Sequence, residues 1–409
     1  MNACILTIGY ELLQGFTIDT NANWISKILL SKGIQVKKIL TIGDEHNIIK
    51  KETCKILDEK FDYVFVTGGL GPTHDDVTKN AFCDIFSDEM YFDENYYSQL
   101  KKKFKEFKGD VNNFPKINKS QAMLLKKADS INNLHGSALG LHYVNKNTHI
   151  FIMPGVPFEM KAMMNSYIVP KYMKNKLKND LITINTTGIM ESQLAEIIEP
   201  LMEKYSSTCD FAFLPSYTGV SFRIYHSNSK DDFNKIINDF YRKMEPYAFG
   251  FDNDTLESVL AKKLTKKRLT IATAESCTGG LVGKRLTDIP GSSKYFLGSI
   301  VAYDNQLKTD FLGISSDILQ SNGAVSENVA LKMAESIRTN TQADIGISTT
   351  GISGPSGGNE SKTLGLVFIG LSMKNISSAK RYVFKVSRHI HREITTTAAL
   401  NIIRLAIEN

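Results

Sequence analysis

Two hydrophobic patterns alternate along residues 1–170: continuous apolar runs, typical of buried strands, and spaced apolar positions, typical of amphipathic helices. Asp19-Thr20 supplies a cap for the first predicted helix, which ends at Gly33, and a second helix is predicted over 46–60. The predicted strands between them cover 3–8, 34–42, 63–66 and 149–153. Strand–helix–strand spacing of this kind predicts parallel pairing through right-handed crossovers. We therefore expect residues 1–170 to form one α/β domain.

Residues 171–252 follow a different pattern, in which short strands and helices are not regularly alternated. Strands are predicted at 181–186 and 220–225, the second with the alternation of a half-buried strand, and helices at 191–204 and 231–244. No catalytic group of side chains gathers here. We predict a small α+β domain that connects the two ends of the chain.

The strand–helix alternation resumes over residues 253–409. The predicted strands are 269–274, 300–303, 343–348 and 365–371. Helices are expected over 255–264, after the cap residue Ser326, and at the end of the chain, where Ile394, Ala398, Ile402 and Ala406 mark one face. The fold class is thus predicted as α/β, with two parallel-sheet domains joined by a small α+β module.

Composition places the 409-residue chain among soluble globular proteins, with 42% hydrophobic and 22% charged residues. No apolar stretch reaches the roughly 18 residues that a membrane helix needs. The start of the chain runs straight into a predicted strand, without a basic segment or cleavage site. We expect a cytoplasmic protein without membrane association.

Charge and cysteine usage narrow the classes further. The net charge of +6 is spread along the chain, and the basic run 101–108 lies opposite the apolar face of a predicted helix, so no direct nucleic-acid binding is expected. The five cysteines are scattered without a Cys-x-x-Cys pair, which disfavours a disulfide framework or a cysteine zinc site.

The first candidate for chemistry is the glycine-rich segment 66–76, which follows a predicted buried strand. Gly68, Gly69 and Gly71 would let the backbone approach a ligand and point N–H groups at a phosphate. Asp75 and Asp76 would then place oxygen ligands for Mg²⁺ or a similar cation beside that phosphate. A tight strand-to-helix turn with an acidic cap explains the same residues equally well.

The second candidate is the segment 273–280, which also follows a strand and opens a helix. A nucleophile on such a turn would be exposed at the carboxyl end of the sheet, where backbone N–H groups could stabilise an oxyanion. Ser276 and Cys277 are both possible nucleophiles. A P-loop is rejected because only three residues separate Gly279 from Gly283 and Arg285 replaces the required hydroxyl residue.

Two further segments are expected to converge on that turn, because loops at the carboxyl ends of parallel strands share one crevice. Tyr303 and Lys308 lie between a strand and a helix, and the glycine-rich segment 349–358 follows another strand. A desolvated lysine can take the proton of a serine hydroxyl, although a lone lysine is more often a solvated surface residue. The crevice would join a nucleophile, a base, a phenol and an anion cradle.

Several long motifs in this order resemble the CinA family, named for competence/damage-inducible protein A, over essentially the whole chain. The motifs are Ile8-Gly9-x-Glu11-Leu12-Leu13, Asp19-Thr20-Asn21, Gly68–Thr73 with Asp75-Asp76, Pro154-Gly155-Val156-Pro157-x-Glu159-Met160, Ala274–Gly280, Gly323–Glu327 and Gly351–Pro355.

The resemblance implies a molybdopterin-binding-like first domain, linked in this family to metal-dependent pyrophosphatase activity on ADP-ribose. It also implies a last domain similar to nicotinamide-nucleotide amidases, which convert nicotinamide mononucleotide to nicotinic acid mononucleotide and ammonia in pyridine nucleotide recycling. Ser276 would be the nucleophile, with Tyr303 and Lys308 as activating partners and no cofactor. The implied substrate-binding residues are Thr278, Gly279, Gly280, Gly351, Ser353, Gly354, Gly68, Gly69, Gly71, Thr73, Asp19 and Asn21. A homodimer is expected from the same resemblance.

Three positions depart from the family pattern. Tyr10 stands where an aspartate is common, and Leu124 and Leu139 stand near or at positions where proline is common. These departures weaken the expectation of catalysis in the first domain. The alternative function is a nucleotide- or molybdopterin-binding adaptor in competence or the DNA damage response.

Overall fold

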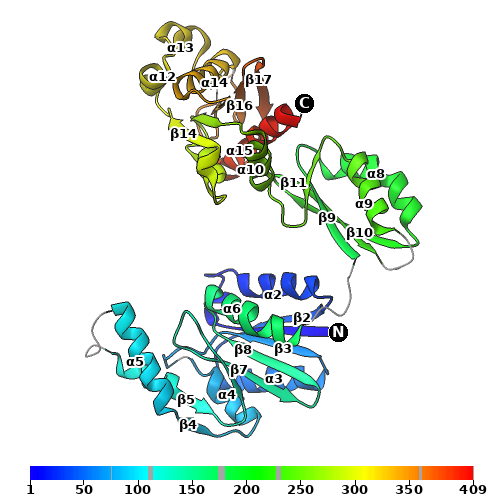
Figure 1. The fold of residues 1–409 in the computed structure, drawn as a ribbon, viewed down its shortest axis with the longest axis vertical. Helices are drawn as coiled ribbons and strands as arrows, with labels where there is room; N and C mark the ends of the chain where they lie inside the picture. The colour runs from blue at the N-terminus through cyan, green and yellow to red at the C-terminus, as the bar shows by residue number, and fades with distance from the viewer. Residues whose placement is uncertain (75, 109–113, 174–179, 227–231, 359–361, 409) are drawn as a thin grey trace. The chain divides into compact units, whose positions relative to one another are not determined.

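A computed structural model describes residues 1–74, 76–108, 114–173, 180–226, 232–358 and 362–408 (Figure 1). The chain divides into two compact units, Met1–Asn179 and Asp180–Asn409. Among the described helices, none has the length and apolarity needed to cross a bilayer.

The first unit is built on a six-stranded sheet in the order β2-β1-β3-β8-β7-β6. The strands are β1 (Asn2–Ile8), β2 (Gln35–Ile42), β3 (Tyr63–Thr67), β6 (Asp129–Ile131), β7 (Gly140–Asn145) and β8 (Thr148–Met153). The four strands from β2 to β8 pair in parallel, as the strand–helix–strand spacing predicts. The remaining two are antiparallel, because the two-residue link between β7 and β8 is too short for a crossover.

Helices cover both faces of this sheet (Figure 1). One face packs against α2 (Thr20–Ser31) and α6 (Pro157–Met163), and the other against α3 (His46–Asp58) and α4 (Thr78–Ile85). Alternate residues of β1 divide between the two cores, Ala3 and Ile5 on one side and Leu6 and Ile8 on the other. This doubly wound arrangement brings the turns after β1, β3 and β8 to one edge of the sheet.

A smaller part of the first unit lies beside the sheet. It contains α5 (Glu94–Lys108), the short 3₁₀ segment η2 (Lys116–Ala122), and the hairpin of β4 (Met90–Phe92) with β5 (Met123–Leu125). Leu124 is buried in its core, against which Leu139 also packs. Both leucines that depart from the family pattern thus have packing roles in this structure.

The second unit begins with a four-stranded antiparallel sheet in the order β10-β11-β9-β12. Its elements are β9 (Asp180–Thr186), α8 (Glu191–Tyr205), β10 (Cys209–Ser216), β11 (Gly219–His226), α9 (Phe233–Lys243) and β12 (Ala248–Phe251). Both helices pack their apolar faces on this sheet. The α9 helix begins where the Asp232 side chain accepts the N–H groups of Asn234 and Lys235.

The rest of the second unit is a five-stranded sheet in the order β14-β13-β15-β16-β17. Its strands are β13 (Ile271–Glu275), β14 (Phe296–Val301), β15 (Ile345–Gly351), β16 (Leu366–Ser372) and β17 (Ser377–Val383). The first three are parallel, and β16 and β17 are antiparallel. Both α/β sheets therefore keep the predicted parallel core and add antiparallel strands at one side.

This sheet also has two cores. The helices α10 (Leu256–Lys267), α11 (Leu281–Thr287) and α15 (Arg388–Glu408) line one core. The other contains side chains of α12 (Asn305–Leu312), α13 (Ser316–Asn322) and α14 (Glu327–Thr341). The closing helix α15 begins at Arg388, before the first apolar residue that marks it in the sequence.

Candidate functional site

The turn after β13 is organised by the buried carboxylate of Glu275. Its Oε2 accepts the hydroxyl of Thr278 at 2.6 Å and the N–H of Val282 at 3.1 Å, and its Oε1 accepts the N–H of Gly283 at 2.8 Å. Glu275 thereby holds the start of α11, where a negative charge is favourable. Sequence analysis missed this role, because Glu275 ends an otherwise apolar strand and resembles a surface residue by type.

Ser276 is fixed at the point where β13 ends. Its N–H donates to the carbonyl of Thr349 at the end of β15 at 2.9 Å, and its side chain is largely buried. The neighbouring Cys277 is also buried, and burial raises the pKa of its thiol to about 12. The thiolate is thus scarce at neutral pH, which favours Ser276 over Cys277 as a nucleophile.

Lys308 lies at the same end of the sheet. The β13–β14 register pairs Glu275 with Val301, so Ser276 and Ala302 directly follow a paired position. The Lys308 ammonium donates to the carbonyls of Ala302 at 2.8 Å and Tyr303 at 3.1 Å. Its side chain is buried, and this burial lowers the pKa of Lys308 below the ordinary value. Lys308 is therefore a desolvated lysine and not a solvated surface residue.

Tyr303 and the glycine-rich loop after β15 are joined by Arg388, which was not among the predicted site residues. Arg388, at the start of α15, donates one guanidinium N–H to the Tyr303 hydroxyl at 2.7 Å and another to the carbonyl of Gly354 at 2.9 Å. The Tyr303 ring is exposed, so its hydroxyl proton remains available to a ligand. The predicted convergence of Tyr303 and the loop therefore depends on α15.

Two further residues of α15 reach the same loops. Arg392 donates to the carbonyl of Thr278 through Nε at 3.1 Å and Nη2 at 2.7 Å. The buried His391 lies 2.9 Å from the Ser353 hydroxyl through Nδ1 and 3.1 Å from the carbonyl of Gly365 through Nε2. Because burial lowers the pKa of His391, the ring is neutral, and Nε2–H donates to Gly365 while Nδ1 accepts from Ser353.

A signal for these α15 residues exists in the sequence. Basic side chains are unfavourable at the positive end of a helix, yet Arg388, His391 and Arg392 crowd the start of α15, whose first turn has no acidic residue. Among the described residues, neither arginine forms an ion pair with a carboxylate. Such uncompensated charge indicates an anionic ligand.

The other predicted residues of this site fall into two groups: some face the protein interior, and others lie on the turn after β13. The Thr278 hydroxyl is turned inward, to Glu275 and to Thr349 Oγ1 at 2.7 Å, and a Cβ at Gly351 would crowd Leu366 and Val367. The Thr278 side chain and the close packing at Gly351 therefore stabilise the fold. In contrast, Gly279 and Gly280 are on the turn itself, and within the described chain the N–H groups of Thr278 and Gly280 donate to no protein acceptor. These two N–H groups are candidates for an oxyanion hole.

The glycine-rich turn of the first unit is held in a conformation that only glycine fits at two positions. Gly68 and Gly69 have φ values of 111° and 66°, and a Cβ would collide with the carbonyl of Ile8 and with Thr78 Oγ1, respectively. Gly71 donates its N–H to Asp76 at 2.7 Å. The turn therefore has a strict structural requirement for glycine in addition to any ligand.

The predicted cation ligands at this turn are placed only in part. Asp76 accepts the N–H of Gly71, the N–H of Thr73 at 2.9 Å and the Thr73 hydroxyl at 2.5 Å, so its carboxylate holds the glycine-rich turn, whereas α4 begins after Val77 without a side-chain cap. Asp75 lies outside the described residues. In the part of the chain that is described, no three His, Cys, Asp or Glu side chains gather as a metal site requires. The described residues do not by themselves fit a divalent metal.

The other residues predicted for the first domain meet at the end of β1. Asp19 caps α2 by accepting the N–H of Ala22 at 2.9 Å, and Asn21 donates to the carbonyl of Gly155 at 2.7 Å. They line a cavity of 90 Å³ together with Glu11. Tyr10, in contrast, is turned to the Glu45 carboxylate, to which its hydroxyl donates.

Polar atoms without protein partners surround the glycine-rich turn. Within the described chain, Asn21 Oδ1, Thr78 Oγ1 and Gln121 Oε1 are buried and have no hydrogen-bond partner. Gln121 reaches the turn by donating its amide N–H to the carbonyl of Leu70 at 3.1 Å. Buried polar atoms are usually satisfied, so three such atoms at one turn indicate a polar ligand there.

Comparison with known proteins matches three segments of the chain to family models. The profile described as "Probable molybdopterin binding domain" matches residues 4–174, "Damage-inducible protein CinA KH domain" matches 182–247, and "CinA C-terminal domain" matches 253–407.

Full-length relatives and solved structures are also similar. The chain is 37% identical over 422 residues to a CinA-like protein of Chloroherpeton thalassium, covering 99% of both chains. It is 36% identical over 419 residues to one of Chlorobaculum tepidum, covering 98% of this chain and 97% of the relative. The crystal structure of competence/damage inducible protein CihA from Agrobacterium tumefaciens matches with 34% identity and a TM-score of 0.36, over 38% of this chain and 94% of that chain. Given the two full-length relatives, this chain belongs to the CinA family.

Proposed function

We propose that the last domain hydrolyses the carboxamide of nicotinamide mononucleotide, giving nicotinic acid mononucleotide and ammonia. The observation that carries this proposal is the position of the buried Lys308. Its ammonium contacts the Ala302 carbonyl directly after β14, and Ser276 directly follows the neighbouring strand β13. A buried lysine with a lowered pKa is suited to take a proton from a serine hydroxyl, and amide hydrolysis by serine requires such a base.

The hydrogen bonds of Lys308 support its proposed role as the base. A neutral amine has two N–H donors and one lone pair, and the carbonyls of Ala302 and Tyr303 occupy the two donors. The lone pair then accepts the Ser276 proton as Oγ attacks the carboxamide carbon. The ammonium returns that proton to the departing nitrogen, which leaves as ammonia. Water repeats the sequence on the acyl-enzyme, releasing the carboxylate and restoring Ser276.

The negative charge of the substrate phosphate is complemented by two arginines at the start of α15. Arg388 and Arg392 hold loop carbonyls and form no ion pair with carboxylates among the described residues, so they can attract the phosphate of a mononucleotide. The loop itself lines a cavity of 830 Å³ with Ser356, Gly357 and Lys385. We place the ribose phosphate on this loop.

Ammonia release from nicotinamide mononucleotide by the full chain tests the proposal. Ser276→Ala should abolish the release, whereas Cys277→Ala, the matched change at the next residue, should retain it. Full activity of the Ser276→Ala protein would contradict a serine mechanism. No ammonia from folded wild-type protein would favour the adaptor function in competence or DNA damage.

We propose a second activity for the first domain, namely cleavage of the pyrophosphate of ADP-ribose. The three unpartnered polar atoms around Gly68–Gly71 support it, since a nucleotide would supply their missing partners. We derive no step through a divalent cation, because the described residues do not form a site for one. The test is AMP release from ADP-ribose by the Ser276→Ala protein, with and without Mg²⁺, and its loss on Gln121→Leu. Persistence of AMP release at the wild-type rate in that variant would contradict the placement.

A further inference from the structure

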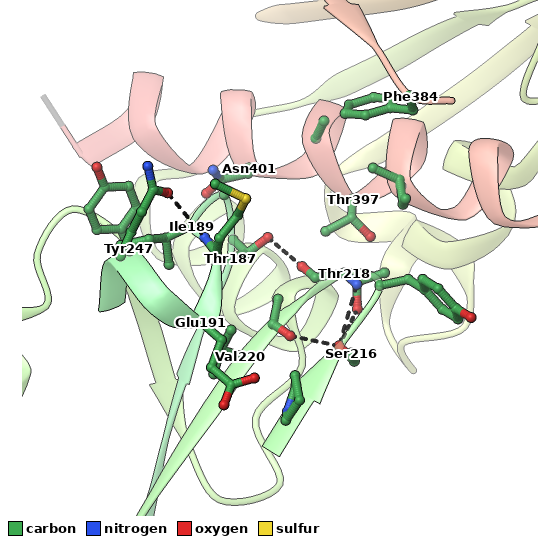
Figure 2. Close-up of a pocket in the computed structure, with 18 of the residues that line it drawn as sticks. Thr187, Ile189, Glu191, Ser216, Thr218, Val220, Tyr247, Phe384, Thr397 and Asn401 are labelled. Atoms are coloured by element: carbon green, nitrogen blue, oxygen red, sulfur yellow. Dashed lines mark hydrogen bonds between the residues drawn. The ribbon is translucent and has the colours of Figure 1, made fainter. Parts of the chain in front are cut away.

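Two adjoining cavities in the second unit lie apart from the Ser276 turn. One has a volume of 660 Å³ and the other 470 Å³. They lie between the four-stranded sheet and helix α15, and Figure 2 shows the first of them. The two cavities adjoin and are treated as the two halves of one cleft, because they share the lining residues Thr187, Ser216, Thr218, Gly219 and Thr397. Volumes of this size suit a small organic molecule.

The larger half of the cleft is aromatic and aliphatic. Tyr382 and Phe384 stack with ring centroids 5.4 Å apart, and Tyr217 and Tyr247 line the same space. Polar side chains also line this half, among them Glu191, Gln193 and Asn401. The Asn401 carbonyl accepts a hydrogen bond from Arg404 at 2.9 Å, which leaves its amide N–H groups as donors for a ligand. Walls of this kind bind a planar ring with at least one acceptor atom.

The smaller half is polar and rich in acceptors. Its lining includes hydroxyl and amide side chains and three carboxylates: Asn185, Thr186, Ser221, Asn253, Asp252, Asp254 and Glu257. The lining cation, Arg285, is already bound to Glu257 and donates to the Thr397 hydroxyl at 2.7 Å. Asp254 is likewise ion-paired, with Lys262 at 2.9 Å, so among the described residues Asp252 is the lining carboxylate of this half without a cation, and it favours hydroxyl groups over a phosphate.

We propose that the cleft binds a nucleoside, a planar heterocycle joined to an uncharged sugar. The ring would lie among the tyrosines and Phe384, with an acceptor atom on Asn401, and the sugar hydroxyls would bond the polar half. The acidic lining selects against nucleotides, in contrast to the arginine-rich site of the amidase reaction. The proposal does not depend on that reaction, since no residue of the Ser276–Gly280 turn lines the cleft.

The position of the cleft links it to α15. Thr397 and Asn401 lie on the same helix as Arg388 and Arg392, which bind the loops around Ser276. A nucleoside in the cleft would contact that helix directly.

Adenosine is the probe, because it has the ring and the ribose but neither a carboxamide nor a phosphate. Calorimetric titration of the full chain should show saturable binding at one site, with AMP at least roughly tenfold weaker. Tyr217→Ala should weaken adenosine binding by roughly tenfold, because a stacked aromatic contact is lost. Tyr217 is 70% exposed, so this change leaves the core intact, and Tyr91→Ala, at another exposed tyrosine, is the matched control.

Ala398→Trp places an indole in the apolar half and should abolish binding. Absence of saturable adenosine binding would overturn the proposal. Binding that is equal in the wild-type, Tyr217→Ala and Ala398→Trp proteins would overturn it as well, as would tighter binding of AMP than of adenosine.

Discussion

Replacing Glu275 with glutamine removes the charge that holds the Ser276 turn to the start of α11. The two carboxylate oxygens each accept one backbone N–H, from Gly283 at 2.8 Å and from Val282 at 3.1 Å. Glutamine has the same shape, but one of these oxygens becomes an NH₂ group. Whichever orientation the amide takes, one buried N–H then faces another donor.

The expected effect follows from the burial of this group. A hydrogen bond to a charged acceptor contributes about 1.5–3 kcal/mol, and the favourable interaction of a charge with a helix start adds about 0.3–1 kcal/mol. We expect the free energy of local opening at the start of α11 to fall by about 2–3 kcal/mol in Glu275→Gln. At about 1.4 kcal/mol per tenfold change, hydrogen exchange should accelerate by about 30- to 140-fold.

Hydrogen exchange measured by mass spectrometry on peptides spanning 276–287 tests this expectation. Peptides over β3 in the first unit give an internal reference that should not change. Glu327→Gln is the matched control, because Glu327 is an exposed carboxylate in the first turn of α14. Unchanged exchange over 276–287 in a folded Glu275→Gln protein would refute the proposed role of this carboxylate.

Three further changes test other parts of the molecule. Lys308→Met should lower kcat by about 10²- to 10⁴-fold with little change in KM. In the wild-type protein, kcat/KM should rise with pH as Lys308 loses its proton, at a pH below its ordinary pKa of 10.5, and this rise should be absent in Lys308→Met. Gly69→Ala should destabilise the first unit by about 1–3 kcal/mol, measured by urea unfolding with the single tryptophan, Trp24, as reporter. Burial lowers the pKa of Lys79 to about 8 from 10.5. The unfolded chain then binds more protons between these values, so the stability of the first unit should rise with pH there relative to Lys79→Met in the same assay.

The parallel cores and the Ser276 turn could be predicted because apolar periodicity reports burial directly. Ser276 and Lys308 follow neighbouring parallel strands, and parallel strands bring their carboxyl ends to one edge. The strand β16 was predicted but its antiparallel direction was not, because an apolar run fits either direction, and the largely polar β17 gave no apolar run at all.

Apolar periodicity could not reveal residues whose role depends on their charge or on their hydrogen-bond partners. Periodicity marks α15 from Ile394 onward, so its polar first turn with Arg388 and Arg392 had no apolar signal. Asp76 shows a second limit, since a carboxylate that holds a turn and one that binds a cation look the same in a sequence, and only the bonds to Gly71 and Thr73 distinguish them.

The central claim is that Ser276 forms a covalent acyl-enzyme. Turnover of nicotinamide mononucleotide in the presence of hydroxylamine tests it most directly, because hydroxylamine competes with water for an acyl group that is held on the protein. We predict a hydroxamate product that increases with hydroxylamine concentration and is absent with Ser276→Ala. Formation of the carboxylate alone at every hydroxylamine concentration, together with ammonia release by Ser276→Ala, would contradict the mechanism.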